Sequence, residues 1–219
     1  MPTPWVRAVQ ETAQLTVFPT QQLVNASAWG QALFTRILTE FNRLATTGRF
    51  GVRLLQSSQA QSPQGGGANV QFDISNGNHT FFDFSGQPVQ DTLNVAPGNI
   101  KGVTYKITGG FGKVVKAFVF VPLAPTLGPG QRGVGPGVKM ALSLHELLHA
   151  CGLDATDAGH NPPFNPADLY MSGGLLMEGS TPDKDKVLFS RGEPDAQGQF
   201  TLTSRTIGQV QDVWLLGQF

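Results

Sequence analysis

One short run of the chain has the residue types and the spacing needed to bind a metal ion and to move a proton. The run is HELLH at 145–149. Side chains four residues apart lie on one face of an α-helix, so His145 and His149 can reach the same ion, and neutral imidazole is a common zinc ligand. Glu146 lies about 100° further round the helix, where it can take a proton from water on the metal. The pattern predicts a zinc site with a general base.

The wider sequence favours a metal site over a buried helix that merely contains two core histidines. The chain has four histidines, and three of them, His145, His149 and His160, fall within 145–160. The helix that carries the first two is expected over 138–151, is apolar on most sides and should be buried. The remaining histidine, His79, is expected in a turn or strand.

The run HELLHACGLDATDAGH at 145–160 resembles the metzincin clan of zinc metallopeptidases, whose motif is HExxHxxGxxH followed by a Met-turn. His145, Glu146, His149 and Gly152 match this motif. The resemblance implies that Gly152 turns the chain sharply out of the helix, so that a third ligand returns to the metal. Glycine can end a helix in the left-handed region without steric cost. The two residues flanking it, Cys151 and Leu153, are expected to pack around that turn.

The third metal ligand departs from the family pattern. The family's third histidine would fall at Ala155, which cannot bind a metal. A longer loop can deliver His160, which is the preferred third ligand. Asp157 and Asp154 are alternatives, because carboxylate is also an accepted third ligand for zinc.

Two methionines are candidates for the Met-turn. Met177 in LLMEGSTP is preferred, because a closing helix follows it as in the family; Met171 in DLYMSGG is the alternative. Tyr170 is a weaker candidate for a residue near the cleft that hydrogen-bonds an oxyanion.

The resemblance implies a zinc-dependent endopeptidase that hydrolyses peptide bonds with a zinc-bound water activated by Glu146. His145, His149 and His160 would hold Zn²⁺, and the substrate would be a protein or peptide. One alternative is a gluzincin-like zinc peptidase with Glu178 as the third ligand. The other is a non-catalytic, zinc-containing binding or structural protein, which the low charge and the Gly-rich and Gln-rich composition would fit.

The elements that must position this site follow from periodicity and turn residues. A helix is expected over 27–46, where apolar residues recur at helical spacing, with Ser27 as its cap and Gly48 at its end. The site helix at 138–151 follows, and a last helix is expected over 203–214. Short apolar runs predict strands at 14–18, 50–56, 69–74, 79–84, 102–108 and 114–121.

This order of elements is similar to that of metzincins and implies an α+β fold. The expected fold has a small mixed twisted sheet with a backing helix, a buried active-site helix, a loop-rich lower part and a C-terminal helix. The strand at 114–121 is the most apolar and is placed inside the sheet. The strand at 102–108 is the candidate for the edge strand on which the family holds substrate by β-augmentation. The chain is read as one catalytic domain, 1–219, with an upper part at about 1–152 and a lower part at about 153–219.

Composition limits the other classes of function. The formal net charge is zero, with 15 basic and 15 acidic residues. The chain therefore lacks the excess of positive charge that is typical of a nucleic-acid-binding protein. A single cysteine excludes an intrachain disulfide framework. No apolar run reaches membrane-spanning length, and the first residues lack the basic start and continuous apolar stretch of a signal peptide. We expect a monomer with no membrane partner, which either stays inside the cell or leaves it by another route.

Overall fold

The computed structural model describes residues 2–63, 65–92, 102–126, 133–153, 169–171, 200–202 and 204–215. The helices are α1 (Arg7–Gln10), α2 (Gln21–Asn25), α3 (Gln31–Thr47), α4 (Pro136–Ala150) and α6 (Ser204–Trp214), with a 3-10 turn η1 (Gly110–Gly112). The strands are β1 (Gln14–Pro19), β2 (Arg53–Gln56), β3 (Val70–Ser75), β4 (Asn78–Phe82), β5 (Pro88–Thr92), β6 (Val103–Thr108), β7 (Val114–Pro122), β8 (Leu169–Met171) and β9 (Phe200–Leu202).

Five strands form the central sheet in the order β2-β1-β3-β7-β6. The first four run parallel, and β6 runs antiparallel to β7 at one edge. Parallel neighbours need a long crossover, which α2 and α3 supply between β1 and β2. The sheet is therefore mixed, and the strand predicted at 102–108 is confirmed as an edge strand beside the apolar strand predicted at 114–121.

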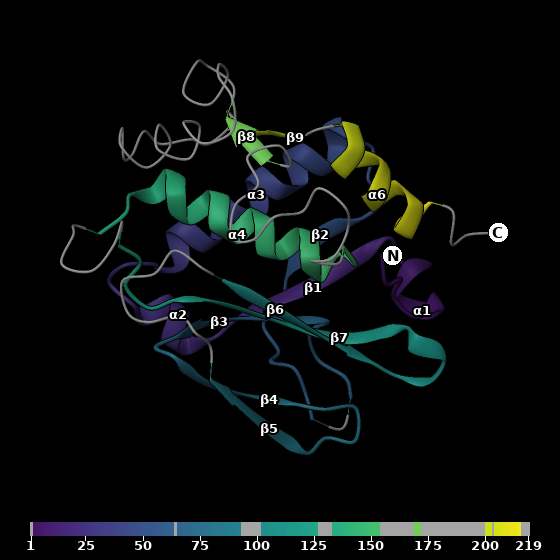
Figure 1. Ribbon diagram of the computed structural model, residues 1–219, viewed down its shortest axis with the longest axis horizontal. Coiled ribbons are helices and arrows are strands. Elements are labelled where there is room, and N and C mark those ends of the chain that lie inside the picture. Colours follow the sequence, from purple (N-terminus) through teal and green to yellow (C-terminus); the bar gives the residue numbers. More distant parts are fainter. Residues whose placement is uncertain are drawn as a thin grey trace.

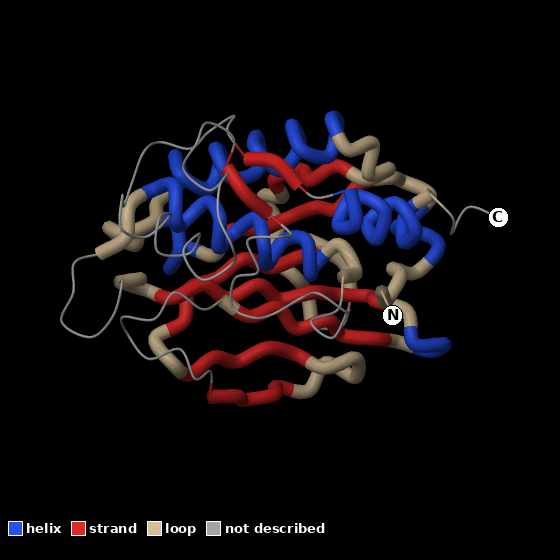
Figure 2. The backbone as a smooth tube through the Cα atoms, turned by 45° about the horizontal axis from the view of Figure 1, so that its top comes forward, coloured by secondary structure: helices blue, strands red, loops and turns tan. Residues whose placement is uncertain are grey.

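The two faces of the sheet are covered differently (Figures 1 and 2). Helices α3 and α4 pack on one face, here called the helix face, and the β4–β5 hairpin covers the other, here called the hairpin face. Side chains alternate along β7, since successive residues of a strand point to opposite faces. Val119 and Val121 join the large core on the helix face, while Phe118 and Phe120 join a small aromatic cluster with the hairpin.

The first predicted helix is present, but its predicted start is wrong. Helix α3 begins at Gln31 after Gly30, which has φ +88°. Trp29 is buried, and its indole N–H donates to the backbone oxygen of Pro122 at 2.9 Å. This contact between distant segments holds the residues before Gly30 in a turn, so Ser27 does not cap the helix.

The described residues form a mixed α+β structure with a mixed five-stranded sheet and a few helices, as predicted. The helix predicted at 203–214 is confirmed as α6. Six short elements are additional to the prediction: α1, α2, β5, η1, β8 and β9. None of the helices in the described part of the chain is long and apolar enough to cross a membrane.

Candidate metal centre

The predicted site helix is confirmed as α4, which lies against β6, β7 and α3. It begins two residues earlier than predicted because Pro136 occupies its first turn, where the missing backbone N–H costs no hydrogen bond. All but two of its fifteen residues are buried. The polar side chains of the motif are buried too, with exposed fractions of 6% for His145, 4% for Glu146 and 8% for His149. Buried polar groups need partners or a ligand.

The two histidines of α4 are placed as a pair of metal ligands would be. Nε2 of His145 and Nε2 of His149 are 3.3 Å apart, and the ring planes lie 80° to each other. Two nitrogens bound to one tetrahedral zinc ion at ~2.0–2.1 Å would lie about 3.3–3.4 Å apart. The separation of the two nitrogens therefore fits a shared zinc ion.

The other ring nitrogen of His149 determines which of its nitrogens can bind a metal. Nδ1 lies 3.0 Å from the backbone oxygen of Leu153. Because a carbonyl oxygen can only accept, Nδ1 carries the proton and Nε2 keeps its lone pair toward His145. Lys106 Nζ donates to the same Leu153 oxygen at 2.8 Å and to the Gly152 oxygen at 3.3 Å. A hydrogen-bond acceptor at the ring nitrogen that does not bind the metal orients a histidine ligand, and the Leu153 oxygen is such an acceptor.

Glu146 is enclosed by the start of β6. Thr104 Oγ1 lies 2.8 Å from Glu146 Oε2 and 2.9 Å from the Glu146 backbone oxygen. A Cβ on Gly102 would lie 2.6 Å from Cγ and 2.8 Å from Oε1 of Glu146, so only glycine leaves this side chain its place. Burial raises the pKa of Glu146 to about 8, with the Thr104 hydrogen bond acting in the opposite direction. Burial therefore disfavours the charged form of this carboxyl, and a nearby cation would favour it.

The end of α4 is held by donors from distant parts of the chain. Gly152 has φ +116°, which confirms the predicted glycine turn out of the helix, and its carbonyl accepts from the backbone N–H of Thr3 at 2.7 Å. The indole N–H of Trp5 donates to the Ala150 oxygen at 2.8 Å, and that of Trp214 donates to the Cys151 oxygen at 2.9 Å. The carbonyls that every helix leaves without an internal partner are satisfied here by side chains and backbone from elsewhere.

The two residues flanking Gly152 are buried, as predicted. Cys151 has no exposed surface and is a free thiol, and Leu153 is 7% exposed. Burial also raises the pKa of the Cys151 thiol, which makes it a poor nucleophile and a poor metal ligand. Both residues act as packing side chains around the turn.

The remaining predicted site residues lie outside the residues that the structure describes. These are the preferred and alternative third ligands, the gluzincin-like candidate and the preferred Met-turn methionine: His160, Asp157, Asp154, Glu178 and Met177. The backbone of Met171 and Tyr170 is described, in strand β8, which pairs with β9 and lies beside α4. Within the described ranges, no group of three or more His, Cys, Asp or Glu side chains that could hold a metal is found. His145 and His149 are therefore a two-donor set there.

Several residues that shape the site were not predicted as such. Thr104 and Gly102 contact Glu146, Lys106 contacts the turn after α4, and Trp5 and Trp214 bind its last carbonyls. All of them are far from the motif in sequence. The edge strand at 102–108 was the one signal that pointed to part of this group.

The comparisons with known proteins identify no family for this chain. The chain matches no protein-family model, no curated protein and no solved structure. The paired histidine nitrogens, the enclosed glutamate and the edge strand beside them are therefore the observations that bear on function.

Proposed function

We propose that the chain is a zinc-dependent endopeptidase of the metzincin type. The observation that carries this proposal is the 3.3 Å separation of the His145 and His149 Nε2 atoms, with Glu146 next to them on the same buried helix. A structural site needs no carboxylate between its ligands, whereas a hydrolytic site needs a base there. The positive φ of Gly152 supports the same reading, because it ends the helix three residues after the second histidine.

The proposed third ligand is His160, which the resemblance favours. Asp157 and Asp154 are the alternatives, since a carboxylate can replace a histidine in this position. A third protein ligand would leave the fourth position of a tetrahedral zinc ion open for water or substrate, which distinguishes catalytic zinc sites from structural ones.

The residues of this chain would divide the chemistry as follows. A bound zinc ion would act as a Lewis acid toward water and toward the carbonyl group of the substrate. Glu146 would accept a proton from the attacking water at its carboxylate and then pass that proton to the leaving amine. Thr104 holds this carboxylate at 2.8 Å, and the missing side chain of Gly102 leaves room for it to keep one position.

Strand β6 is the proposed binding strand for the substrate. It pairs with β7 on one side only, so among the described strands its other side is an open edge. Such an edge offers backbone N–H and C=O groups to an extended peptide. Because Thr104 of β6 and Gly102, the residue just before β6, lie against Glu146, a peptide paired with β6 would lie next to the proposed base.

Glu146→Gln tests the proposal. The variant keeps the size of the side chain and can still hydrogen-bond to Thr104, but it has no basic carboxylate. We expect it to fold, to bind about one zinc ion per chain as the wild type does, and to cleave protein substrates at least ~100-fold more slowly. Zinc content by elemental analysis and cleavage of casein or a peptide library are measured on the same preparations. Glu11→Gln, an exposed glutamate paired with Arg7, is the matched control and should behave as wild type.

The combined result separates the alternatives. Wild-type protein that binds no zinc would contradict the proposal. Protein that holds zinc but cleaves nothing across a broad library would favour the zinc-containing binding protein. Full activity in Glu146→Gln would show that another group is the base.

A further inference from the structure

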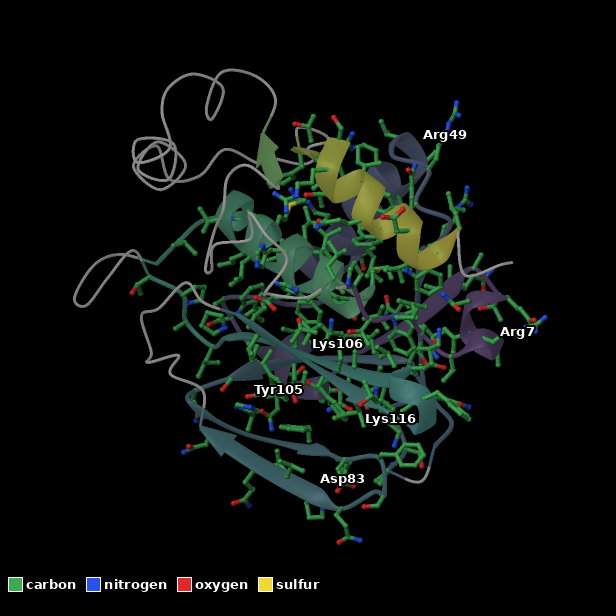
Figure 3. The ribbon with its side chains drawn as sticks, turned by 45° about the vertical axis from the view of Figure 1, so that its right-hand side comes forward. Arg7, Arg49, Asp83, Tyr105, Lys106 and Lys116 are labelled. Carbon is green, nitrogen blue, oxygen red and sulfur yellow. The ribbon has the colours of Figure 1, made fainter. Side chains whose placement is uncertain are left out.

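A cavity of about 770 Å³ lies on the hairpin face, on the other side of the sheet from α4. Its walls come from α2, β3, the β4–β5 hairpin and β7, and its lining residues are Gln22, Asp73, Ile74, Asn78, His79, Thr80, Gln90 and Phe120. The central sheet separates it from His145 and His149. Neighbouring residues of β6 illustrate the separation: Tyr105 contacts the hairpin, whereas Lys106 contacts the turn after α4 (Figure 3).

Asp73 is the one carboxylate among the described residues of this lining, and none of these residues is a lysine or an arginine. Its Oδ1 accepts hydrogen bonds from Thr20 Oγ1 and from the backbone N–H of Ile74, which fix the orientation of the carboxylate. Its Oδ2 has no hydrogen-bond partner among the residues that the structure describes. Burial raises the pKa of Asp73 above its ordinary value, although the hydrogen bonds and the field of His79 act in the opposite direction. A cation next to Oδ2 would counter this cost of burial.

Two aromatic rings, those of His79 and Phe120, line the same cavity as this carboxylate. The ring of His79 lies 4.4 Å from the ring of Phe120, measured between centroids, and His79 Nε2 lies 3.1 Å from the Tyr105 hydroxyl. These contacts hold the two rings as a wall of the cavity. The rim carries the side chains of Gln22, Asn78, Thr80 and Gln90, which are exposed and can both donate and accept hydrogen bonds.

We propose that this cavity binds a small organic cation, with a primary ammonium or guanidinium group against Asp73 and polar substituents toward the amide rim. A carboxylate attracts organic cations by its charge, and the ring of Phe120 in the same lining adds the attraction of its quadrupole. An anion would meet the carboxylate, and the described lining residues include no lysine or arginine to compensate for it. A metal ion would find one carboxylate and one imidazole, and the described residues contain no group of three or more such ligands. The proposal does not depend on proteolytic activity.

Titration of the full chain with n-butylamine and n-butylguanidine tests the proposal, with n-butanol as the neutral analogue. Backbone amide shifts in ¹H–¹⁵N NMR spectra report the binding position. We expect saturable shifts at the amides of the cavity residues with both cations, and no saturable shift there with n-butanol. Asp73→Asn keeps an oxygen for Thr20 and the Ile74 N–H but removes the charge, so both cations should bind at least about tenfold more weakly, the equivalent of one charge-assisted hydrogen bond.

The matched control is Asp83→Asn, which removes an exposed carboxylate from the turn at the other end of the hairpin (Figure 3) and should leave the affinity unchanged. A second variant, Thr80→Lys, places a tethered ammonium at the exposed rim and should weaken cation binding to a similar degree as Asp73→Asn. The proposal is overturned if n-butanol binds as the cations do or if neither cation shifts the cavity amides. It is also overturned if Asp73→Asn binds as wild type or, should that variant not fold, if Thr80→Lys does.

Discussion

The two faces of the central sheet treat their polar groups differently. On the helix face, the polar side chains of the motif are almost fully buried. Glu146 and the carbonyls at the end of α4 have partners from distant segments, and His149 has the Leu153 oxygen four residues further along the chain. On the hairpin face, the cavity is open, its rim residues are exposed, and one oxygen of Asp73 has no hydrogen-bond partner within the described residues. Burial without room for water forces groups to pair, whereas an open cavity leaves them to a ligand.

This difference separates two ways of building a site. On the helix face the geometry is fixed before any ligand arrives, because hydrogen bonds from β6 and from both ends of the described chain hold α4 and the turn after it. Such preorganisation suits chemistry that depends on small distances. On the hairpin face, Asp73 and two rings are held beside an open cavity with an exposed polar rim, which suits weaker and less exacting recognition of a small molecule.

The largest expected effect comes from replacing one histidine on each face with phenylalanine and comparing the zinc affinities of the two variants. His145→Phe and His79→Phe both keep an aromatic ring and remove its nitrogens. We expect His145→Phe to lower the zinc affinity more than the 10–100-fold typical of outer-shell partners, and His79→Phe to leave it unchanged. Competition with a chromogenic zinc chelator measures both affinities. An equal loss in the two variants would mean that the faces are not independent.

Gly102→Ala tests whether the position of the Glu146 carboxylate on the helix face limits the proposed reaction. The added Cβ would lie within 3 Å of three Glu146 side-chain atoms, so the carboxylate must move. A displacement of about 1 Å can cost on the order of 100-fold in rate, and we expect cleavage to fall between about 10- and 100-fold with zinc retained. In the control Gly110→Ala, the added Cβ would have no atom within 4 Å, and this variant should be as active as wild type. Unchanged cleavage in Gly102→Ala would show that the position of Glu146 does not limit the reaction.

Gly152→Ala tests the turn that ends α4. Gly152 has φ +116°, and a Cβ there would lie 2.7 Å from the Thr3 oxygen, so both strain and a clash are expected. The free energy of unfolding should fall by about 1–3 kcal/mol. In contrast, Gly208→Ala within α6 meets no atom within 4 Å and should stabilise the protein by up to about 1 kcal/mol. Urea denaturation compares the two; equal stabilities would refute the assigned role of Gly152.

The smallest expected effect belongs to Lys106→Met. Its ammonium group holds the Leu153 oxygen that orients His149, and a cation also favours the C-terminal end of a helix. Loss of such an outer partner should weaken zinc binding about tenfold, with the fold retained. The chelator competition described above measures it, and Lys113→Met in the adjoining loop is the control. Wild-type zinc affinity in Lys106→Met would show that Leu153 is held in place by its backbone alone.

The parts of the site that follow from local sequence were predictable. The spacing of His145, Glu146 and His149 is a property of one helix, and Gly152 follows from the steric limits on a helix end. The burial of α4 and the interior position of β7 follow from their apolar runs. Each of these features depends on residues within one or two turns of the chain, and periodicity reports such features directly.

The parts that depend on contacts between distant segments were not predictable in the same way. Thr104 reaches Glu146 only because β6 takes the edge position beside α4, and no local pattern in TYKIT shows that contact. The start of α3 was misplaced because Trp29 is held by the backbone of Pro122. The cavity on the hairpin face needs α2, β3, β4, β5 and β7 together, so Asp73 reads in sequence as an ordinary polar strand residue.

The fastening of α4 by residues near both ends of the described chain has a consequence for the order of assembly. Trp5 and Ala150 are separated by 145 positions, and Trp214 and Cys151 by 63. Contacts of such long range form late in folding, because the loops that they close cost conformational entropy before any contact is gained. We therefore expect α4 to be secured at its C-terminal end only after Trp214 has left the ribosome, so that the proposed metal site would be unfinished in a nascent chain that lacks this residue.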